Sequence, residues 1–337
     1  MKIKIFGVVS LCLGLPVLLS SQVKLNGYLS AEFLKGQSQS EFQNGSFQNV
    51  KGGLLFSGVV GSGFDYALEV RLQDVSRFQI EQALLGFAAS QAFNFRLGLY
   101  LVPFGQYNRS NRPHQTAMIR FPLILEDIYP ESWRDIGLLV EGRTGNILYS
   151  AYVGNGLAET PDLASGQQFK DNNSNKGLGA HLGFTIGGEF EAGFSYYRGK
   201  YDDANARNLT LLGFDASWKT DALQVLGEYA QARLENPAPY ARGEVKGYFI
   251  QVSLSPGKWH PFACYQKSQY EDPFHGFGGG ASSGAPPGIF KDRTRWALGV
   301  DLLLSSTLLF KAEYDINRDK NQSLKNNLFS AQIALSF

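Results

Sequence analysis

The sequence predicts an all-β fold: a transmembrane antiparallel β-barrel of about sixteen strands, with short periplasmic turns and long outer loops. Three observations lead to this prediction. An apolar leader opens the chain, apolar and polar residues alternate along many later segments, and very short turns alternate with longer polar stretches. Together they describe a chain that is exported and then closes into a ring of strands.

The leader, residues 1–21, has the pattern of a secretory signal peptide. Lys2 and Lys4 supply a small positive region, and the uncharged apolar stretch Ile5–Leu19 follows it. This stretch is shorter than the roughly 20 residues of a membrane-spanning helix, so an uncleaved N-terminal anchor is the less favoured alternative. We expect cleavage close to residue 21 and a single outer-membrane barrel domain over residues 22–337.

The strand signal is an alternation of period two. Apolar residues take every second position in several stretches, whereas a helix would space them by three and four. These stretches are Gln22–Leu34, Phe64–Gln73, Phe93–Tyr100, Leu178–Ile186 and Leu308–Asn317. Strands of ~9–11 residues cross a bilayer when they are tilted, and runs of this length recur along the chain.

Connections of two kinds alternate along the chain, seven of them very short and eight longer and more polar. The short turns lie at Gly61–Gly63, Ala89–Ala92, Arg143–Gly145, Gly187–Gly188, Lys219–Asp221, Ser255–Gly257 and Ser305–Ser306. The longer segments lie near Lys35–Ser46, Val75–Arg77, Pro103–Trp133, Asn155–Asn175, Lys200–Ala206, Leu234–Gly243, Tyr270–Lys291 and Arg318–Lys325. An even number of strands places both termini on the periplasmic side and the longer segments outside, although the second of them is short for this layout.

Alternation alone does not separate a membrane barrel from a soluble β-sandwich, because a sandwich also has one apolar and one polar face. The number of strands decides between them. A ring of about sixteen strands encloses an aqueous lumen, so charged residues can face inward while the apolar band meets lipid. A soluble barrel of that width would expose its apolar band to water, and we retain it only as the alternative.

The stretch Phe329–Phe337 alternates strictly and finishes on an aromatic residue. This ending resembles the signal by which the barrel-assembly machinery recognises outer-membrane barrels, which makes Phe337 the candidate assembly residue. The alternative is an ordinary edge strand, but an exposed edge promotes aggregation unless it is paired. We expect this stretch to pair with Gln22–Leu34 and close the wall.

Several kinds of chemistry find no support in the sequence. Lysine and arginine number 31 against 30 aspartate and glutamate, so charge gives no indication of a nucleic-acid partner. The four histidines are scattered without metal-ligand spacing, and no nucleophile-elbow motif occurs. Cys264 is the only cysteine beyond the leader, which excludes an intrachain disulfide there. We therefore predict no catalytic residues, no metal and no cofactor.

The segment Pro103–Trp133 is the strongest candidate functional site, because it combines charges with enough apolar residues to pack rather than stay in solvent. A long outer loop of this kind can fold into a barrel and narrow its lumen. Fixed charges there select ions, because the low-dielectric walls focus their field. The candidate constriction residues are Arg109, Arg112, Arg120, Glu126, Asp127 and Glu131.

Strand alternation also indicates which charged residues face the lumen. The basic candidates are Lys24, Arg71, Arg96 and Lys311, and the acidic ones are Glu32, Asp65, Glu69, Glu313 and Asp315. Both signs occur, which favours a weakly selective aqueous pore. For any one of these residues the alternative is a solvated strand face with no role in selectivity.

Three motifs resemble the phosphate-selective porin O/P family: LGLYLVPFGQYN at Leu97–Asn108, ESWRDIGLLVEG at Glu131–Gly142 and YSAYVGNG at Tyr149–Gly156. The resemblance covers roughly residues 92–160. It implies a porin of about sixteen strands, usually trimeric, whose third outer loop constricts the pore. A phosphate-selective pore needs a ladder of inward basic residues, and this chain shows no clear ladder, so the family name does not identify the solute.

We therefore expect a porin of the bacterial outer membrane, a water-filled passive diffusion channel for small hydrophilic solutes and ions, with anions among the candidates. Its expected partners are outer-membrane lipids, the barrel-assembly machinery, the permeating solutes or ions, and further copies of the chain in a homotrimer. Two alternatives remain open: a substrate-specific channel for sugars or organic acids, and a non-conducting structural or adhesive barrel.

Overall fold

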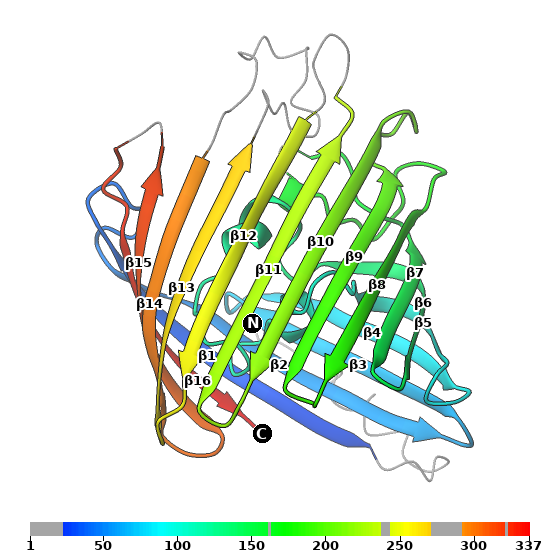
Figure 1. Cartoon of the computed structure of the whole chain (residues 1–337), viewed down its shortest axis with the longest axis horizontal. Coiled ribbons are helices and arrows are strands. Elements are labelled where there is room, and N and C mark those ends of the chain that lie inside the picture. The colour runs from blue at the N-terminus through cyan, green and yellow to red at the C-terminus, as the bar shows by residue number, and fades with distance from the viewer. Residues whose placement is uncertain (1–22, 161–162, 237–242, 271–291, 321–322) are drawn as a thin grey trace, which may run out of the picture.

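A computed structural model describes residues 23–160, 163–236, 243–270, 292–320 and 323–337. Within these residues sixteen strands form one closed antiparallel barrel, which confirms the predicted fold class (Figure 1). The predicted signal peptide, residues 1–21, lies outside the described residues. The predicted outer segment Tyr270–Lys291 also lies outside them, except for its first residue.

The strands are β1 Lys24–Gly36, β2 Ser46–Val60, β3 Phe64–Gln73, β4 Arg77–Ala88, β5 Asn94–Leu101, β6 Arg134–Thr144, β7 Ile147–Gly154, β8 Gly177–Ile186, β9 Phe190–Lys200, β10 Asn208–Lys219, β11 Leu223–Leu234, β12 Gly243–Leu254, β13 Trp259–Tyr270, β14 Asp292–Leu303, β15 Leu308–Asp319 and β16 Leu328–Ser336. The helical pieces are the 3-10 turns η1 Tyr107–Ser110 and η2 Leu163–Ser165 and the short α2 Leu123–Asp127. No helix among the described residues is long and apolar enough to cross a membrane.

Each strand pairs with the next along the chain, and β1 closes the ring by pairing with β16. The closing register sets Tyr28 opposite Ser336 and Phe33 opposite Ala331. This confirms the predicted pairing of the alternating stretch Phe329–Phe337 with the first strand. A closed ring leaves no strand edge on which another chain could add.

Short and long connections lie at opposite ends of the barrel, as predicted, with the short hairpins at the lower end in Figure 1. In the turn between β8 and β9, Gly187 and Gly188 have φ values of 62° and 79°. A tight hairpin needs this left-handed conformation, which costs glycine little because it has no Cβ. The outer turn between β3 and β4 is also tight, with positive φ at Asp74 and at the β-branched Val75.

The wall has an apolar outer face and a polar inner face. On β8, the side chains of Leu178 and Leu182 are 57% and 56% exposed on the outside, whereas His181 is buried inside. A soluble protein buries such leucines, so the inverted pattern identifies a surface whose solvent is lipid.

An irregularity between β3 and β4 shapes the lumen. Glu69 pairs with Gln82 and Val70 pairs with Ile80, so Glu81 is an extra residue on β4. A β-bulge of this kind re-aims side chains. Here it leaves Glu81 fully buried on the inner side, among cationic groups of the wall.

Candidate functional site

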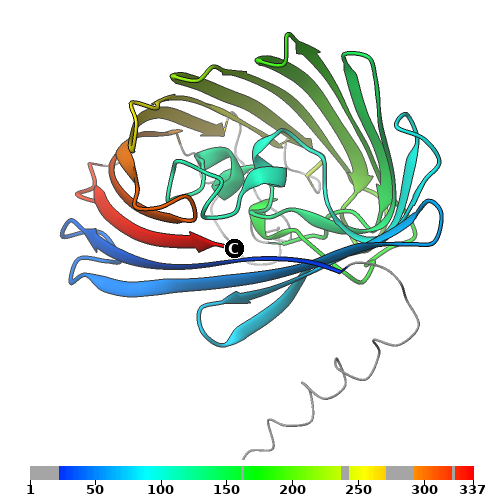
Figure 2. The ribbon, with the colours of Figure 1, turned by 90° about the horizontal axis from the view of Figure 1, so that it is seen from below.

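The segment between β5 and β6, residues 102–133, is called the lumen loop below. It runs inside the ring of strands, as the view from below shows (Figure 2). Its two ends meet at the wall, where the Val102 N–H donates to the Trp133 carbonyl over 2.8 Å. The buried Asn108 completes this junction of the two loop ends, called the neck below. Its amide nitrogen donates to the carbonyls of Val102 and Trp133, at 2.9 and 3.0 Å, and its amide oxygen accepts the Trp133 N–H at 2.7 Å.

One side of the lumen loop packs against the inner face of the wall. Its helix α2 contacts β12 and β13, and Leu123 and Ile124 are buried there. The ring of Trp133 meets the rings of Phe104 and Tyr197 with centroids 5.7 and 5.1 Å apart. These residues belong to the main apolar cluster of the protein. The loop is therefore folded against the wall rather than suspended in the lumen.

Two wall carboxylates hold the backbone of the lumen loop. Glu228 on β11 accepts the N–H groups of Gln106 at 2.7 Å and Tyr107 at 2.5 Å. Glu313 on β15 accepts the N–H of Ile119 at 2.7 Å. The two oxygens of a carboxyl group can accept hydrogen bonds from several donors. Each acid therefore satisfies loop N–H groups that no strand pairs.

Gly105 lies where the lumen loop comes closest to one of these carboxylates. Its φ is 65°, and a Cβ at this position would lie 2.4 Å from a carboxylate oxygen of Glu228. Only glycine meets both conditions without displacing the acid. This residue completes the Pro-Phe-Gly turn of the first motif quoted above.

At the tip of the loop, five charged residues form what we call the tip cluster. Two nitrogens of Arg295 lie 2.9 and 3.1 Å from the Glu126 carboxylate, and Arg120 and Arg293 approach it to 3.0 and 3.2 Å. Asp127 binds Arg293 at 2.8 Å. Burial opposes the charged form of Glu126, but Arg295 and Arg120 outweigh it and hold the pKa well below the usual range. The predicted constriction residues Arg120, Glu126 and Asp127 are thus brought together and largely neutralised at the wall.

A cavity of about 250 Å³ adjoins the tip cluster and is lined by Arg120, Arg293 and Arg295. Two further cavities lie on the other side of the loop, toward β1–β4 and β16. An outer cavity of about 200 Å³ is lined by Tyr28 together with Lys51, Arg71, Arg134 and Glu131. Three of these side chains are cationic and one is acidic. Glu131 is exposed to this cavity. Desolvation by the surrounding protein, together with the charge of Glu126, raises its pKa to about 7.

An inner cavity of about 450 Å³ lies toward the periplasmic end, where its lining includes Glu69, Arg112 and His114. Tyr28 lines both cavities, and its ring lies 5.6 Å from the ring of His114. Arg112 forms an ion pair with Glu69 across the gap between loop and wall. Tyr28 therefore lies at the boundary between the two cavities.

Arg71 links the wall to the lumen loop at this boundary. Its Nε donates to the Tyr28 hydroxyl at 3.0 Å, and another of its nitrogens donates to Ser132 Oγ at 2.9 Å. It also lies 3.0 Å from the buried Glu81, which Arg134 approaches to 3.4 Å. The acid introduced by the β-bulge thus fixes two of the three cations of the outer cavity.

The remaining predicted site residues lie in different parts of the barrel. Arg96 and Arg109 both bind Glu141 at 2.9 Å, below the lumen loop. Lys24 is exposed at the start of β1. The prediction that Lys311 lines the water-filled lumen is corrected: Lys311 faces inward but is fully buried under the loop, where it donates to the carbonyl of Thr116.

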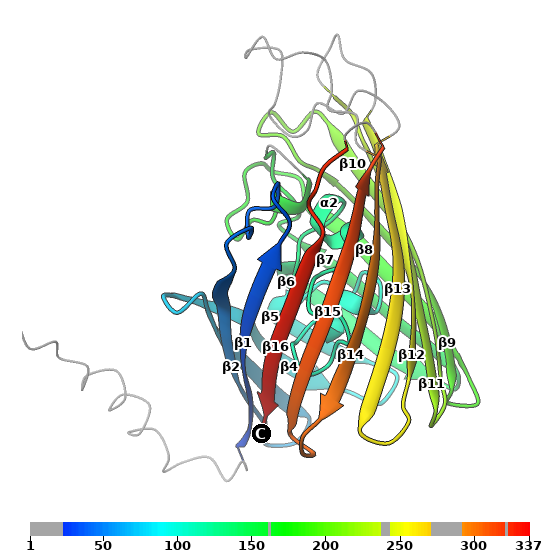
Figure 3. The same ribbon diagram turned by 90° about the vertical axis from the view of Figure 1, so that its left-hand side faces the viewer.

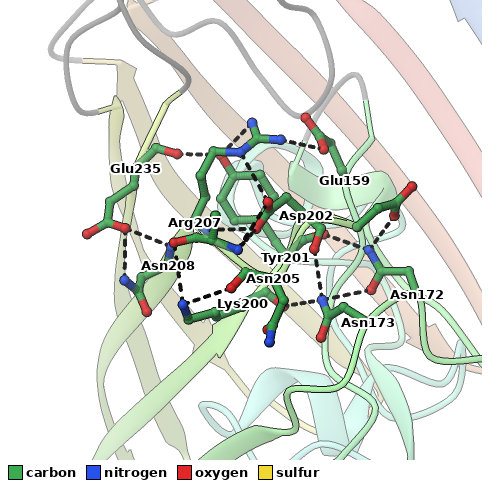
Figure 4. A network of polar contacts seen from close by, with 12 residues as sticks. Glu159, Asn172, Asn173, Lys200, Tyr201, Asp202, Asn205, Arg207, Asn208 and Glu235 are labelled. Atoms are coloured by element: carbon green, nitrogen blue, oxygen red, sulfur yellow. Dashed lines mark hydrogen bonds and ion pairs between the residues drawn. The ribbon is translucent and has the colours of Figure 1, made fainter.

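The outer rim carries a polar network that ties neighbouring loops together (Figure 4). Asn173, from the segment after β7, donates to the carbonyls of Lys200 and Asp202, both at 3.1 Å. Arg207 reaches Glu159 at 2.7 Å and Asp202 at 3.6 Å. The segments that follow β7 and β9 are therefore locked to each other at the mouth of the barrel.

Several important residues do not follow from the sequence pattern. Glu81 is turned inward by a bulge that alternation does not reveal, and Lys51 precedes two glycines, where the period is blurred. Arg134 stands inside the second motif quoted above, which was its only signal. Glu228 and Asn108 gain their roles from long-range contacts with the lumen loop. Among the described residues, no group of three or more histidine, cysteine or acidic side chains is placed to hold a metal ion.

A family model described as "Gram-negative porin" matches residues 10–322. The fold is similar to that of OmpF of Salmonella typhi, solved with daunomycin (TM-score 0.69, 11% identity, 94% of this chain and 97% of that one). It is also similar to an anion-selective porin of Comamonas acidovorans (0.65, 14%, 94% and 100%) and to the trimer form of OmpT of Vibrio cholerae (0.66, 12%, 94% and 99%). An uncharacterized protein of Aquifex aeolicus is 26% identical over 140 residues, which span 41% of this chain and 30% of that protein.

Proposed function

The chain belongs to the Gram-negative porin family of the bacterial outer membrane, and we propose that it forms a water-filled passive channel for small hydrophilic solutes and ions. The observation that carries this proposal is the pair of cavities that meet at Tyr28, between the lumen loop and the wall of β1–β4. A solute would travel along this wall rather than through the centre of the barrel, because the lumen loop fills the opposite side.

Conductance in a planar bilayer tests the proposal. The full chain is expected to give stable current steps, because a fixed polar passage conducts without gating. Replacing Tyr28 by alanine should raise the step size, and replacing it by tryptophan should lower it. Tyr66 faces outward on β3, so Tyr66→Ala serves as the matched control and should leave the steps unchanged. Well-folded protein without steps would overturn the proposal, and steps that ignore both Tyr28 variants would overturn the proposed route.

We infer a modest preference for anions. Its support is the lining of the outer cavity, which includes Lys51, Arg71 and Arg134 but one acid, Glu131. Glu81 and Glu32, which pair with these cations, are buried in the wall and do not line the cavity. Fixed charges in a narrow passage with low-dielectric walls act on ions more strongly than the same charges on an open surface. One of the similar structures is described as an anion-selective porin, which makes charge preference the first property to measure here.

The finer resemblance to phosphate-selective porins rests on the three motifs around the lumen loop. We propose that the chain shares the neck of that loop, with its Pro-Phe-Gly turn, without sharing phosphate selectivity. The basic residues near the passage are paired with acids, as Arg112 is with Glu69 and Lys51 with Glu32 at 3.5 Å, and they form no continuous inward ladder. Blockade of the current by millimolar phosphate, but not by chloride, would contradict this.

We propose a homotrimer that forms through the outer face of β1–β5. Large apolar side chains there are strongly exposed, among them Phe64 at 56%, Phe78 at 75% and Leu97 at 60%. One similar structure is described as a trimer. The variant Leu97→Lys should shift the mass in detergent to that of one chain, whereas Leu182→Lys, which points outward on β8 and lies outside this face, should not. Equal masses for the two variants would contradict the choice of face.

Two further proposals concern biogenesis. Residues 1–21 act as a cleaved signal peptide, and Phe337 is read by the barrel-assembly machinery. Outward alternation of Phe329, Ile333 and Phe337, which are 39%, 46% and 55% exposed, supports the second. We propose a channel without enzyme activity, and its partners are then lipids, the assembly machinery and the permeating solutes.

A further inference from the structure

The outward face of the wall changes character near the outer end of β9, β12 and β13. On each of these strands a tyrosine and a basic residue lie two positions apart on the same face, and the basic residue is the one nearer the outer end. Residues that share a face of one strand are roughly 7 Å apart, so the cation lies about that far above the ring. The pairs are Tyr196 with Arg198, Tyr248 with Lys246, and Tyr265 with Lys267.

The rings of Tyr248 and Tyr265, together with that of Trp296, form a continuous aromatic row. The rings of Tyr248 and Tyr265 lie 6.0 Å apart, and those of Tyr265 and Trp296 lie 4.9 Å apart. The row crosses β12, β13 and β14, seen side by side in Figures 1 and 3. Tyrosine and tryptophan gather at the boundary between hydrocarbon and headgroups. The row therefore marks the depth at which lipid headgroups begin.

The cations stand on the headgroup side of this row and lie close to one another. Lys267 on β13 is the register partner of Tyr248 on β12, and Lys246 is two residues from Tyr248 on the same face. The two lysines are therefore diagonal neighbours, roughly 7–8 Å apart. Arg233 on β11 stands above Gln231, the register partner of Lys246. We call Arg198, Arg233, Lys246 and Lys267 the basic belt.

Two acids accompany the basic belt, but they are recessed. Glu244 lies 2.7 Å from Arg233 and 4.0 Å from Lys246, and Asp292 lies 3.9 Å from Lys267. The two carboxyl side chains are 16% and 8% exposed, whereas Arg233 is 49% exposed and each of the two lysines 29%. The acids orient the cations, and the cations present the outermost charge.

We propose that the basic belt binds the phosphate groups of the anionic glycolipid that forms the outer leaflet of Gram-negative outer membranes. A basic residue near an anionic lipid surface contributes about 1 kcal/mol, and arginine can also grip phosphate through two parallel hydrogen bonds. The belt is at the outer end and faces away from the lumen. Its ligand is therefore a lipid of the outer leaflet rather than a permeating solute.

The outer face of β1–β5, which we proposed as the subunit contact, does not repeat the pairing of a tyrosine with a basic residue nearer the outer end. Large apolar side chains dominate this face, among them Phe64, Phe78, Leu85 and Leu97. Its exposed outward cation near the outer end of β1, Lys35, donates to the Gln43 carbonyl at 2.7 Å. The belt thus divides the circumference into a lipid-binding arc over β9–β14 and an apolar arc that contains β1–β5. This division also holds if the proposed trimer does not form, because the belt lies on one chain.

The test uses the full chain in a neutral detergent and titrates it with bisphosphorylated lipid A, with bound lipid counted by native mass spectrometry. The variant combines Arg198→Gln, Lys246→Gln and Lys267→Gln. At about 5-fold for each cation removed, its affinity should fall about 100-fold. The matched control combines Arg143→Gln, Lys219→Gln and Lys258→Gln, which remove the same charge from exposed residues at the inner end, and it should bind as the parent does.

Two further probes define the ligand. Lipid A without phosphates should bind weakly and equally to the parent and to the belt variant. Phosphatidylglycerol should bind the parent more weakly than bisphosphorylated lipid A does; equal binding would show a surface for any anionic lipid and overturn the glycolipid assignment. Unchanged affinity of the belt variant for bisphosphorylated lipid A would overturn the belt itself. A β-sheet circular dichroism spectrum identical to that of the parent establishes that the variant is folded.

Discussion

On the side of β9–β15 the lumen loop is held by buried contacts and by the tip cluster, whose arginines line a cavity of about 250 Å³. On the side of β1–β4 it faces the outer and inner cavities across Tyr28 and Arg71. Both sides use arginine and glutamate, but with different consequences. The Arg295 side chain is 1% exposed and forms an ion pair with Glu126, while the Lys51 side chain is 18% exposed and lines the outer cavity. The comparison teaches that the residue type does not decide between a structural and a selective charge. Access to the passage decides it.

The largest expected effect comes from breaking the tip cluster. In Arg295→Met, Glu126 keeps Arg120 and Arg293 but loses its two hydrogen bonds from Arg295, at 2.9 and 3.1 Å. Removing one partner of a buried ion pair costs about 3 kcal/mol or more, so protection of the Leu125 and Ile128 amides from hydrogen exchange should fall about 100-fold. Current noise should rise with it. Arg198→Met, at an exposed outward position, is the control; equal loss of protection in both variants would show that the fixed side is not held by this cluster.

The next largest effect concerns the neck of the lumen loop. Asn108→Ala removes two donors and one acceptor and leaves the Trp133 N–H without that partner. An unsatisfied buried group costs about 1–3 kcal/mol, so the stability of the loop in hydrogen exchange should drop by that amount, with little change in charge preference. Asn94→Ala, which removes one 3.3 Å hydrogen bond, should have a smaller effect. If Asn108→Ala changed the charge preference as much as Lys51→Gln, the neck would contribute to ion selectivity and the contrast between the two sides would be wrong.

A third prediction compares one charge from each side. A unit charge about 6 Å from a passing ion in water is worth about 0.7 kcal/mol, or about threefold in permeability ratio. Lys51→Gln should therefore shift the reversal potential in a dilute salt gradient toward cations by up to that factor. Arg120→Gln should shift it less, because Arg120 binds Glu126 at 3.0 Å and lies away from the proposed route, whereas Lys51 lies 3.5 Å from Glu32 and lines the outer cavity. The reverse order would place the selective charges at the tip cluster.

The smallest effect is a pH dependence confined to the outer cavity. The pKa of Glu131 is raised to about 7, so lowering the pH from 8 to 6 protonates it and removes the charge of the acid that lines the outer cavity beside Lys51, Arg71 and Arg134. Anion preference should then increase. Glu131→Gln should show the higher preference at both pH values and lose this step. A step of the same size in that variant would assign the titration to another group.

The strands, their order and the ends at which they turn could be predicted from the sequence because each depends on local chemistry. Alternation of period two places residues on opposite faces of a strand whatever its neighbours are, and glycine pairs such as Gly187–Gly188 permit tight turns by themselves. The segment Pro103–Trp133 could be singled out for the same reason, since its length and its mixture of charges and apolar residues are visible along the chain.

The direction of individual charges in that segment could not be predicted, because it depends on residues far away in the sequence. Glu126 meets Arg295 across 169 positions, and Ile119 meets Glu313 across 194. Lys311 has the alternation of a lumen residue, but the loop that covers it comes from the other side of the barrel.

The sequence by itself determined a membrane protein that crosses the bilayer with about sixteen alternating strands and carries one loop suited to the lumen. Only the tertiary structure decided which part of the lumen stays open. The lumen loop packs its apolar side on one wall, because buried apolar surface and backbone acceptors are available there, and leaves its polar side facing Tyr28 and Arg71. Which wall offers those partners is a property of the closed ring, and no single stretch of sequence contains it.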